Sequence, residues 1–187
     1  LGVGDALYRY ATQASEVDTV PFGAFRKSLV NEIGGYDESL LTNEDYEFNT
    51  RIRQRGGKIW LDPRIQSVYF SRSTLEGLAR QYWRYGYWKL RMLKRYPATL
   101  RWRQAIPPLF VFSLFTLGLL SPFWYLARIA LLIEVVLYIG ALLAGSLAPA
   151  LKNKDPRLAF MIPIAIMTMH VFWGAGFIYS LISSDRK

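Results

Sequence analysis

The sequence contains no cysteine and a single histidine, His170. Without cysteine it forms no disulfide scaffold and no cysteine-based metal site. No group of histidine, aspartate and glutamate shows the spacing of a metal site, and no internal repeat or low-complexity tract is present. These absences exclude a disulfide-rich domain and a zinc site of the cysteine type.

A translation start and a signal peptide are also missing from the sequence. The chain begins at Leu1 and not at a methionine, and its first residues stand in the middle of a pattern. We therefore expect a fragment of a longer protein whose N-terminal part is missing.

Acidic residues are fewer than basic ones, and the charge is distributed unevenly. The chain has 23 Lys and Arg against 14 Asp and Glu, a net charge of +9. One stretch, residues 80–103, has basic residues and no acid. Its basic residues are Arg80, Arg84, Lys89, Arg91, Lys94, Arg95, Arg101 and Arg103. Such a run could bind nucleic acid. It directly precedes a long apolar segment, however, so anionic lipid headgroups are the better partner.

Charge is almost missing from the second half of the chain, which is strongly apolar. A helix needs about 20 apolar residues to cross a bilayer core. The apolar runs predict three membrane helices, at about 106–121, 123–146 and 158–182. The chain then divides into residues 1–103 and a membrane domain at 104–187.

Polar residues inside these apolar runs are few. Glu134 and His170 are ionisable, and such residues are either functional or paired between helices. The glycines in residues 169–176 would let helices approach closely.

The first half contains several short elements. A helix that begins near Asn43, a good N-cap, places Glu44 and Asp45 in its first turn, where the helix dipole favours anions. Phe48 and Ile52 give it an apolar side, and Gly56-Gly57 ends it. The other elements predicted here are a short strand leading into a turn at 18–25, strands at 58–61 and 65–70, and a helix at 27–33. An aromatic, basic helix at 75–94, which Ser73 or Thr74 can cap, is typical of a membrane interface.

Five motifs occur together in this half. They are Val20-Pro21-Phe22-Gly23-Ala24-Phe25-Arg26-Lys27, Gly34-Gly35-Tyr36-Asp37, Asn43-Glu44-Asp45-Tyr46-Glu47-Phe48, Gly56-Gly57-Lys58-Ile59-Trp60 and Gln81-Tyr82-Trp83-Arg84-Tyr85. In this order they resemble the C-terminal half of a family 2 glycosyltransferase of the GT-A fold. The nearest branch is the membrane-associated one of succinoglycan-type exopolysaccharide biosynthesis. The resemblance covers about residues 1–103, and it implies an α/β fold: the C-terminal part of a Rossmann-like domain, followed by α-helical transmembrane segments.

The resemblance also implies roles for individual residues. Asp45 would be the catalytic base of an inverting sugar transfer, and Glu44 would orient it or bind the acceptor. Gln81 and Arg84 fit the Gln-x-x-Arg-Trp motif that meets the donor diphosphate. Tyr85 replaces the usual tryptophan and still offers a face for stacking on the acceptor sugar. The Asp-x-Asp motif for Mg²⁺ or Mn²⁺ is not in this chain and is expected upstream of Leu1, so the fragment alone would be inactive.

The implied partners are a nucleotide-sugar donor, a lipid-linked or polysaccharide acceptor and membrane lipids, with no nucleic acid. The implied location is the inner or plasma membrane, as a multi-pass protein with its catalytic part in the cytoplasm. A second reading is a non-enzymatic membrane module that binds lipid or a polysaccharide-export partner.

Overall fold

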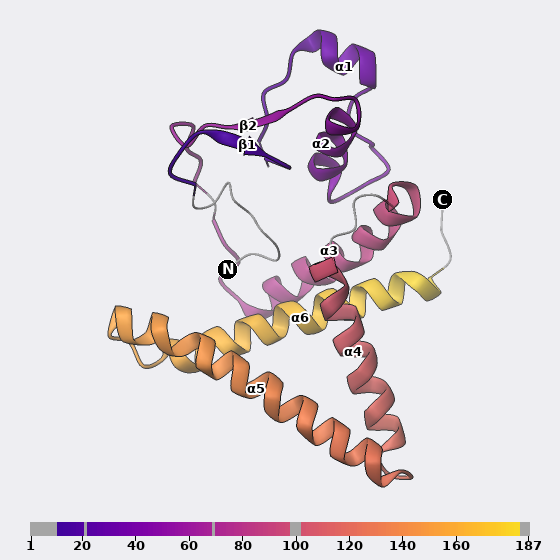
Figure 1. Cartoon of the computed structure of the whole chain (residues 1–187), viewed down its shortest axis with the longest axis vertical. Coiled ribbons are helices and arrows are strands. Elements are labelled where there is room, and N and C mark those ends of the chain that lie inside the picture. Colours follow the sequence, from indigo (N-terminus) through magenta and orange to yellow (C-terminus); the bar gives the residue numbers. More distant parts are fainter. Residues whose placement is uncertain (1–10, 21, 69, 98–101, 184–187) are drawn as a thin grey trace. The chain divides into compact units, whose positions relative to one another are not determined.

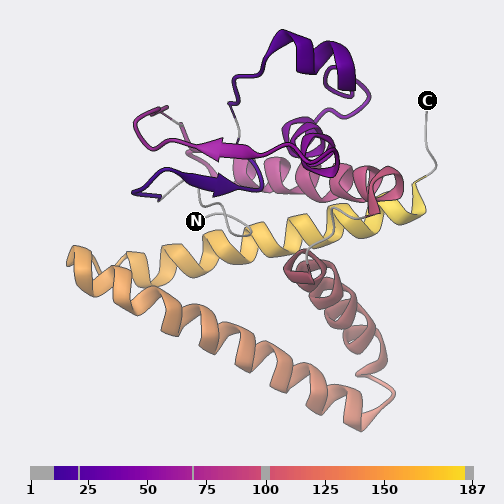
Figure 2. The ribbon, with the colours of Figure 1, turned by 45° about the horizontal axis from the view of Figure 1, so that its top comes forward.

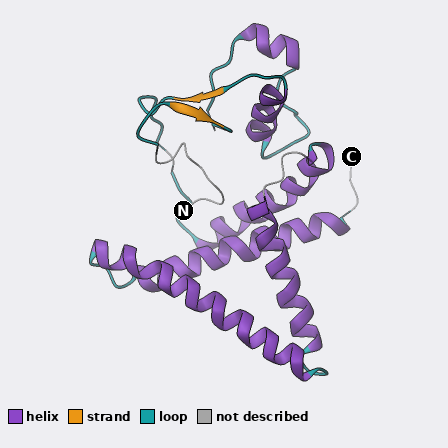
Figure 3. Cartoon of the chain, viewed as in Figure 1, coloured by secondary structure: helices purple, strands orange, loops and turns teal. Residues whose placement is uncertain are grey.

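The computed structural model describes residues 11–20, 22–68, 70–97 and 102–183. These residues are mostly helical, with one small sheet (Figure 3). The chain forms two compact units. The first unit comprises residues 1–71 and 88–104, and the second unit comprises residues 72–87 and 105–187.

The first unit contains a two-stranded sheet and two short helices (Figure 1). Strand β1 (Ser15–Val17) pairs antiparallel with β2 (Ile59–Leu61), and Glu16 lies opposite Trp60. Helix α1 spans Lys27–Ile33 and α2 spans Glu44–Gln54. One apolar cluster joins them, formed by the buried residues Val17, Ile33, Phe48, Ile52 and Ile59. Burial of Phe48 and Ile52 confirms the predicted apolar side of α2.

Helix α2 ends as predicted but begins differently. Gly56 has φ +80°, its N–H donates to the Arg53 carbonyl, and the Gly57 N–H donates to the Ile52 carbonyl. These two bonds form a Schellman ending, which favours glycine at the left-handed position. The prediction that the Asn43 side chain caps the helix is wrong. Asn43 is left-handed (φ 68°), makes no capping hydrogen bond, and its buried amide nitrogen has no partner among the described residues.

Two of the predicted strands are also wrong. The first strand lies at 15–17, and residues 18–20 and 22–25 form no strand. Asn49 on α2 donates from its amide to the Thr19 hydroxyl (2.9 Å) and to the Val20 carbonyl (3.1 Å). These bonds hold this segment against a helix and not against a strand. Residues 65–68 and 70 form no strand, and the side chains of Ile65 and Val68 stay exposed.

The sheet is smaller than an α/β domain requires. Within the described ranges the only strands are β1 and β2, and they run antiparallel. The parallel sheet of a Rossmann-like domain is therefore not seen in this part of the chain.

The second unit consists of long helices. Helix α3 (Leu75–Arg95) gives its first half to this unit and its second half to the first unit. The Thr74 hydroxyl accepts from the Gly77 N–H (3.1 Å) and caps α3, as the sequence predicts. The other helices are α4 (Trp102–Leu120), α5 (Tyr125–Asn153) and α6 (Leu158–Ile182). All three are long and apolar enough to cross a membrane.

Glycine allows the helices of the second unit to pack closely. A Cβ on Gly174 would lie 2.4 Å from the Pro107 carbonyl oxygen on α4, and one on Gly176 would lie 2.3 Å from the Trp83 carbonyl oxygen on α3. Both distances are shorter than any real Cβ contact, so only glycine fits. This confirms the close approach predicted for residues 169–176. Helices α5 and α6 run in opposite directions, lie together near the loop that joins them, and diverge toward their other ends (Figures 1 and 2).

The two polar residues in the apolar runs pair between helices. The Ser113 hydroxyl on α4 donates to the Glu134 carboxylate on α5. The Tyr138 hydroxyl on α5 lies 3.1 Å from Nδ1 of His170 on α6. Of the two alternatives for Glu134 and His170, the structure therefore shows the interhelical pairing.

Candidate functional site

Asp45 and Glu44 begin α2, and both are half-buried. The Tyr46 N–H donates to Oδ1 of Asp45 at 2.7 Å, which orients the carboxylate. Burial raises the pKa of the Asp45 carboxyl, and the nearby Glu44 charge adds to the rise. A carboxylate with a raised pKa is a better proton acceptor than an ordinary one, which suits a general base.

Tyr36, in the loop after α1, lies in the field of the same two carboxylates. Burial raises the pKa of its phenol, and the charges of Asp45 and Glu44 raise it further. The Tyr36 ring also packs on Phe48, with 5.0 Å between ring centroids. The Gly34-Gly35-Tyr36-Asp37 motif therefore belongs to the surroundings of the acidic pair.

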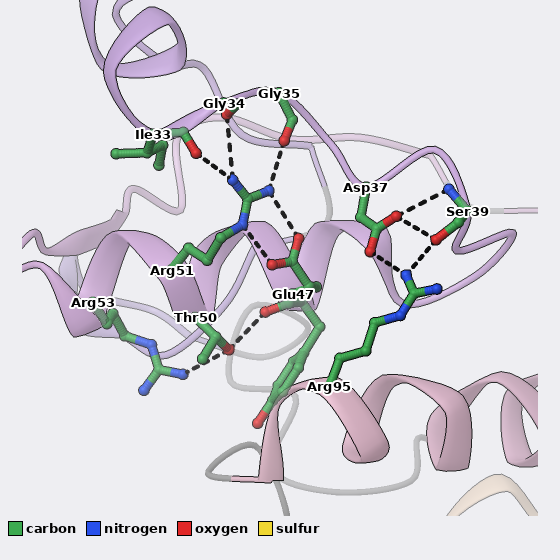
Figure 4. A network of polar contacts seen from close by, with 11 residues as sticks. Ile33, Gly34, Gly35, Asp37, Ser39, Glu47, Thr50, Arg51, Arg53 and Arg95 are labelled. Atoms are coloured by element: carbon green, nitrogen blue, oxygen red, sulfur yellow. Dashed lines mark hydrogen bonds and ion pairs between the residues drawn. The ribbon is translucent and has the colours of Figure 1, made fainter.

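A buried ion pair holds that loop against α2 (Figure 4). The Glu47 side chain is fully buried. Arg51 donates to its carboxylate from Nε to Oε1 and from Nη2 to Oε2, the latter at 2.9 Å. The same guanidinium donates to the carbonyls of Ile33 and Gly35, each at 2.6 Å. Sequence reasoning missed this pair, although the Glu-x-x-x-Arg spacing along a helix was a signal.

A second arginine anchors the other side of the loop. Arg95, near the end of α3, pairs with the Asp37 carboxylate at 2.6 Å and donates to the Ser39 hydroxyl (Figure 4). Burial alone would raise the Asp37 pKa, but the hydrogen bonds from Ser39 and Arg95 hold it below the usual value. Two arginines thus fix the backbone between Gly34 and Ser39.

Lys89 belongs to the basic run at residues 80–103, and the sequence pattern indicated no separate role for it. It is only 3% exposed, and its ammonium lies 4.4 Å from the centre of the Tyr46 ring. Tyr46 directly follows Asp45, so this cation–π contact ties α3 to the first turn of α2 within the first unit.

The predicted diphosphate-binding residues lie in the second unit. The Gln81 amide donates to the Tyr85 hydroxyl at 2.6 Å, one turn further along α3. A tryptophan at position 85 would not supply that acceptor, so the replacement changes how Gln81 is held. Arg84 is exposed and makes no hydrogen bond or ion pair within the described part of the chain. Its guanidinium is available for an anion.

The structure therefore brings the predicted residues together in two sets. Glu44 and Asp45 lie side by side in the first unit, and Gln81, Arg84 and Tyr85 share the first half of α3 in the second unit. Each set is described by itself. Among residues 11–20, 22–68, 70–97 and 102–183, no group of three or more His, Asp or Glu side chains is placed to hold a metal ion. These residues do not fit the expected Mg²⁺ or Mn²⁺, so no step below runs through a metal.

Two curated proteins match the chain over nearly all its length. It is 28% identical over 187 residues to "Succinoglycan biosynthesis protein ExoA" of Rhizobium meliloti (strain 1021), covering 100% of this chain and 55% of that protein. It is 26% identical over 183 residues to "Dolichyl N-acetyl-alpha-D-glucosaminyl phosphate 3-beta-D-2,3-diacetamido-2,3-dideoxy-beta-D-glucuronosyltransferase" of Methanococcus voltae, covering 97% and 53%.

The chain spans about half the length of these relatives and aligns with their C-terminal part. No family profile and no solved structure matches it. The names of these relatives nevertheless agree with the exopolysaccharide-biosynthesis and glycosyltransferase resemblance of the five motifs. The chain is thus similar to the C-terminal part of a succinoglycan biosynthesis protein and of a glycosyltransferase, as the resemblance of its motifs predicts.

Proposed function

We propose that this chain is part of a membrane-bound inverting glycosyltransferase of family 2. It moves a sugar from a nucleotide-diphosphate donor to a lipid-linked or polysaccharide acceptor. The observation that carries the proposal is Asp45, a half-buried carboxylate with a raised pKa, oriented at a helix start and set in a sequence similar to two biosynthetic proteins. The name of the Methanococcus voltae relative, a transferase acting on a dolichyl-linked sugar phosphate, favours a lipid-linked acceptor.

The proposed reaction uses Asp45 as the general base. The acceptor hydroxyl attacks the anomeric carbon and gives its proton to the Asp45 carboxylate. The bond from that carbon to the diphosphate oxygen breaks, and the nucleoside diphosphate leaves with the bonding electrons. Glu44 contacts the acceptor, and the Tyr85 ring stacks on its sugar. Gln81 and Arg84 bind the diphosphate, where a guanidinium offers paired donors to phosphate oxygens. The ligands for Mg²⁺ or Mn²⁺ lie outside this chain.

Arg84 variants test the donor assignment. In membranes that contain the protein encoded by the complete gene, we expect Arg84→Ala to weaken nucleoside-diphosphate binding about tenfold or more, since a charge-assisted contact is lost. Arg84→Lys should restore only part of it, because a lysine cannot form a bidentate fork. The measurement is sugar transfer from labelled nucleotide-sugars, with nucleoside-diphosphate inhibition as the binding readout. Exposed Arg72→Ala is the control.

Two results would contradict the proposal. Equal nucleotide binding by both Arg84 variants and the parent would remove the donor role from Arg84. Absence of any transfer from a panel of nucleotide-sugars, together with tight lipid binding, would favour the alternative, a non-enzymatic membrane module that binds lipid or an export partner.

The catalytic part is proposed to face the cytoplasm. The basic residues before α4 and the loop between α5 and α6, which contains Lys154 and Arg157, then share the cytoplasmic side, as the positive-inside rule favours. Because the chain has no cysteine, a Lys154→Cys variant carries a single thiol in this chain. We expect that thiol to react with a membrane-impermeant maleimide only after the cells are opened. Labelling of this thiol in intact cells would contradict the cytoplasmic placement of the loop.

A further inference from the structure

A groove in the second unit lies between the first half of α3 and α6. It has a volume of about 800 Å³. Its wall is apolar, formed by Leu75, Ala79 and Trp83 on α3 and by Phe172 on α6. The volume falls within the range of about 300–1,000 Å³ typical of small-molecule sites. Because α6 is apolar enough to cross a membrane, a hydrocarbon chain is the occupant that the wall favours.

The groove also has a charged rim, which a plain hydrocarbon would not require. Glu76, Arg80 and Arg84 line it one turn apart on α3. Arg80 pairs with Glu76, and both side chains are about three-quarters exposed, so the pair is weakly held and screened by water. With two guanidinium groups and one carboxylate the rim has a net charge of +1. An amphiphile with an apolar tail and an anionic head complements both parts of the groove.

From this arrangement we propose that the groove binds the lipid part of the acceptor: a long isoprenoid-type hydrocarbon chain along Trp83 and Phe172, with its phosphate at Arg80. The proposal rests on the glycosyltransferase function above, because that function supplies the acceptor. In the proposed function Arg84 binds the donor diphosphate, so we assign the lipid phosphate to Arg80. Glu76 then competes with the phosphate for Arg80.

The test is photo-crosslinking of the protein encoded by the complete gene, in nanodiscs, with a photoreactive polyprenyl phosphate. We expect crosslinks on the first half of α3 and on α6 around Thr168, which also lines the groove. Unlabelled polyprenyl phosphate should compete at least about tenfold better than polyprenol or phosphatidylglycerol. Inorganic phosphate alone should not compete.

Three variants locate the lipid. Thr168→Trp fills the groove and should lower labelling about tenfold, whereas Met167→Trp, at the neighbouring exposed position outside the groove, should keep it. Arg80→Ala should also weaken labelling by the photoreactive polyprenyl phosphate about tenfold. Because Arg80 is exposed, this change leaves folding intact. Glu76→Gln should strengthen labelling, since it releases Arg80.

The outcomes separate this proposal from the function on which it rests. Labelling that survives both Thr168→Trp and Arg80→Ala would refute lipid binding in the groove. Equal competition by phosphatidylglycerol would also refute it, because the site would then hold an ordinary boundary lipid. Specific labelling without any sugar transfer by the protein of the complete gene would support lipid binding in the groove and refute the glycosyltransferase function. Sugar transfer that is unchanged in the Thr168→Trp variant would refute acceptor binding in the groove and leave the glycosyltransferase function standing.

Discussion

Replacing Asp45 with asparagine is expected to lower the turnover of sugar transfer by about 10²-fold or more, the usual scale for loss of a general base. The amide keeps the size of the side chain and an acceptor for the Tyr46 N–H, so the start of α2 stays in place. It cannot take the proton of the attacking hydroxyl. The measurement is kcat in membranes containing the protein of the complete gene. Glu32→Gln, on the exposed face of α1, is the matched control and should keep normal turnover.

The raised pKa of Asp45 predicts how both the turnover and the thermal stability of the protein change with pH. Turnover of the parent should fall as the pH drops through the raised pKa, because the base becomes protonated. A carboxyl whose pKa is raised on folding destabilises the folded state above that pKa. Asp45→Asn should therefore unfold at a higher temperature than the parent at neutral pH, with the gain vanishing below the ordinary value of 3.8. Near-normal turnover in this variant would remove Asp45 from the role of base.

Arg51→Met is expected to destabilise the first unit by about 3–5 kcal/mol, the scale for breaking a buried ion pair. The change leaves the fully buried Glu47 carboxylate without its cation and the carbonyls of Ile33 and Gly35 without a donor. Hydrogen exchange of the α2 amides is the measurement, because it reports this unit alone. Exchange should accelerate over α2 and remain unchanged over α6.

Two further variants give this prediction its controls. Glu47→Leu combined with Arg51→Met should recover much of the loss, since an apolar pair can replace a buried ion pair. Arg64→Met removes an exposed ion pair with Asp62 and should change little, although that pair holds the Asp62 pKa at about 2. Equal protection of α2 in the Arg51→Met variant and the parent would show that the ion pair does not hold the loop.

The sequence pattern predicted most of the helices because their signals are local. Helix α1 lies at the predicted residues, the Gly56-Gly57 ending of α2 follows from the conformational freedom of glycine, and Thr74 caps α3 as its position indicates. The three apolar helices follow from length and composition alone. The strand predicted at 18–25 was wrong where a distant side chain binds the segment, since Asn49 holds Thr19 and Val20 from 30 and 29 residues away.

The division between sequence and tertiary structure is clearest at the candidate site. The sequence by itself indicated the candidate residues, namely the acidic pair at the start of α2 and the Gln81 and Arg84 spacing on α3, and it determined the long apolar helices. Only the tertiary structure decided that Arg51 joins buried Glu47 to the Gly34-Gly35 backbone, and that α3 and α6 enclose a groove with a basic rim. The reason is physical. Helix signals act within one turn of the chain, whereas burial, pKa shifts and grooves depend on which distant surfaces meet.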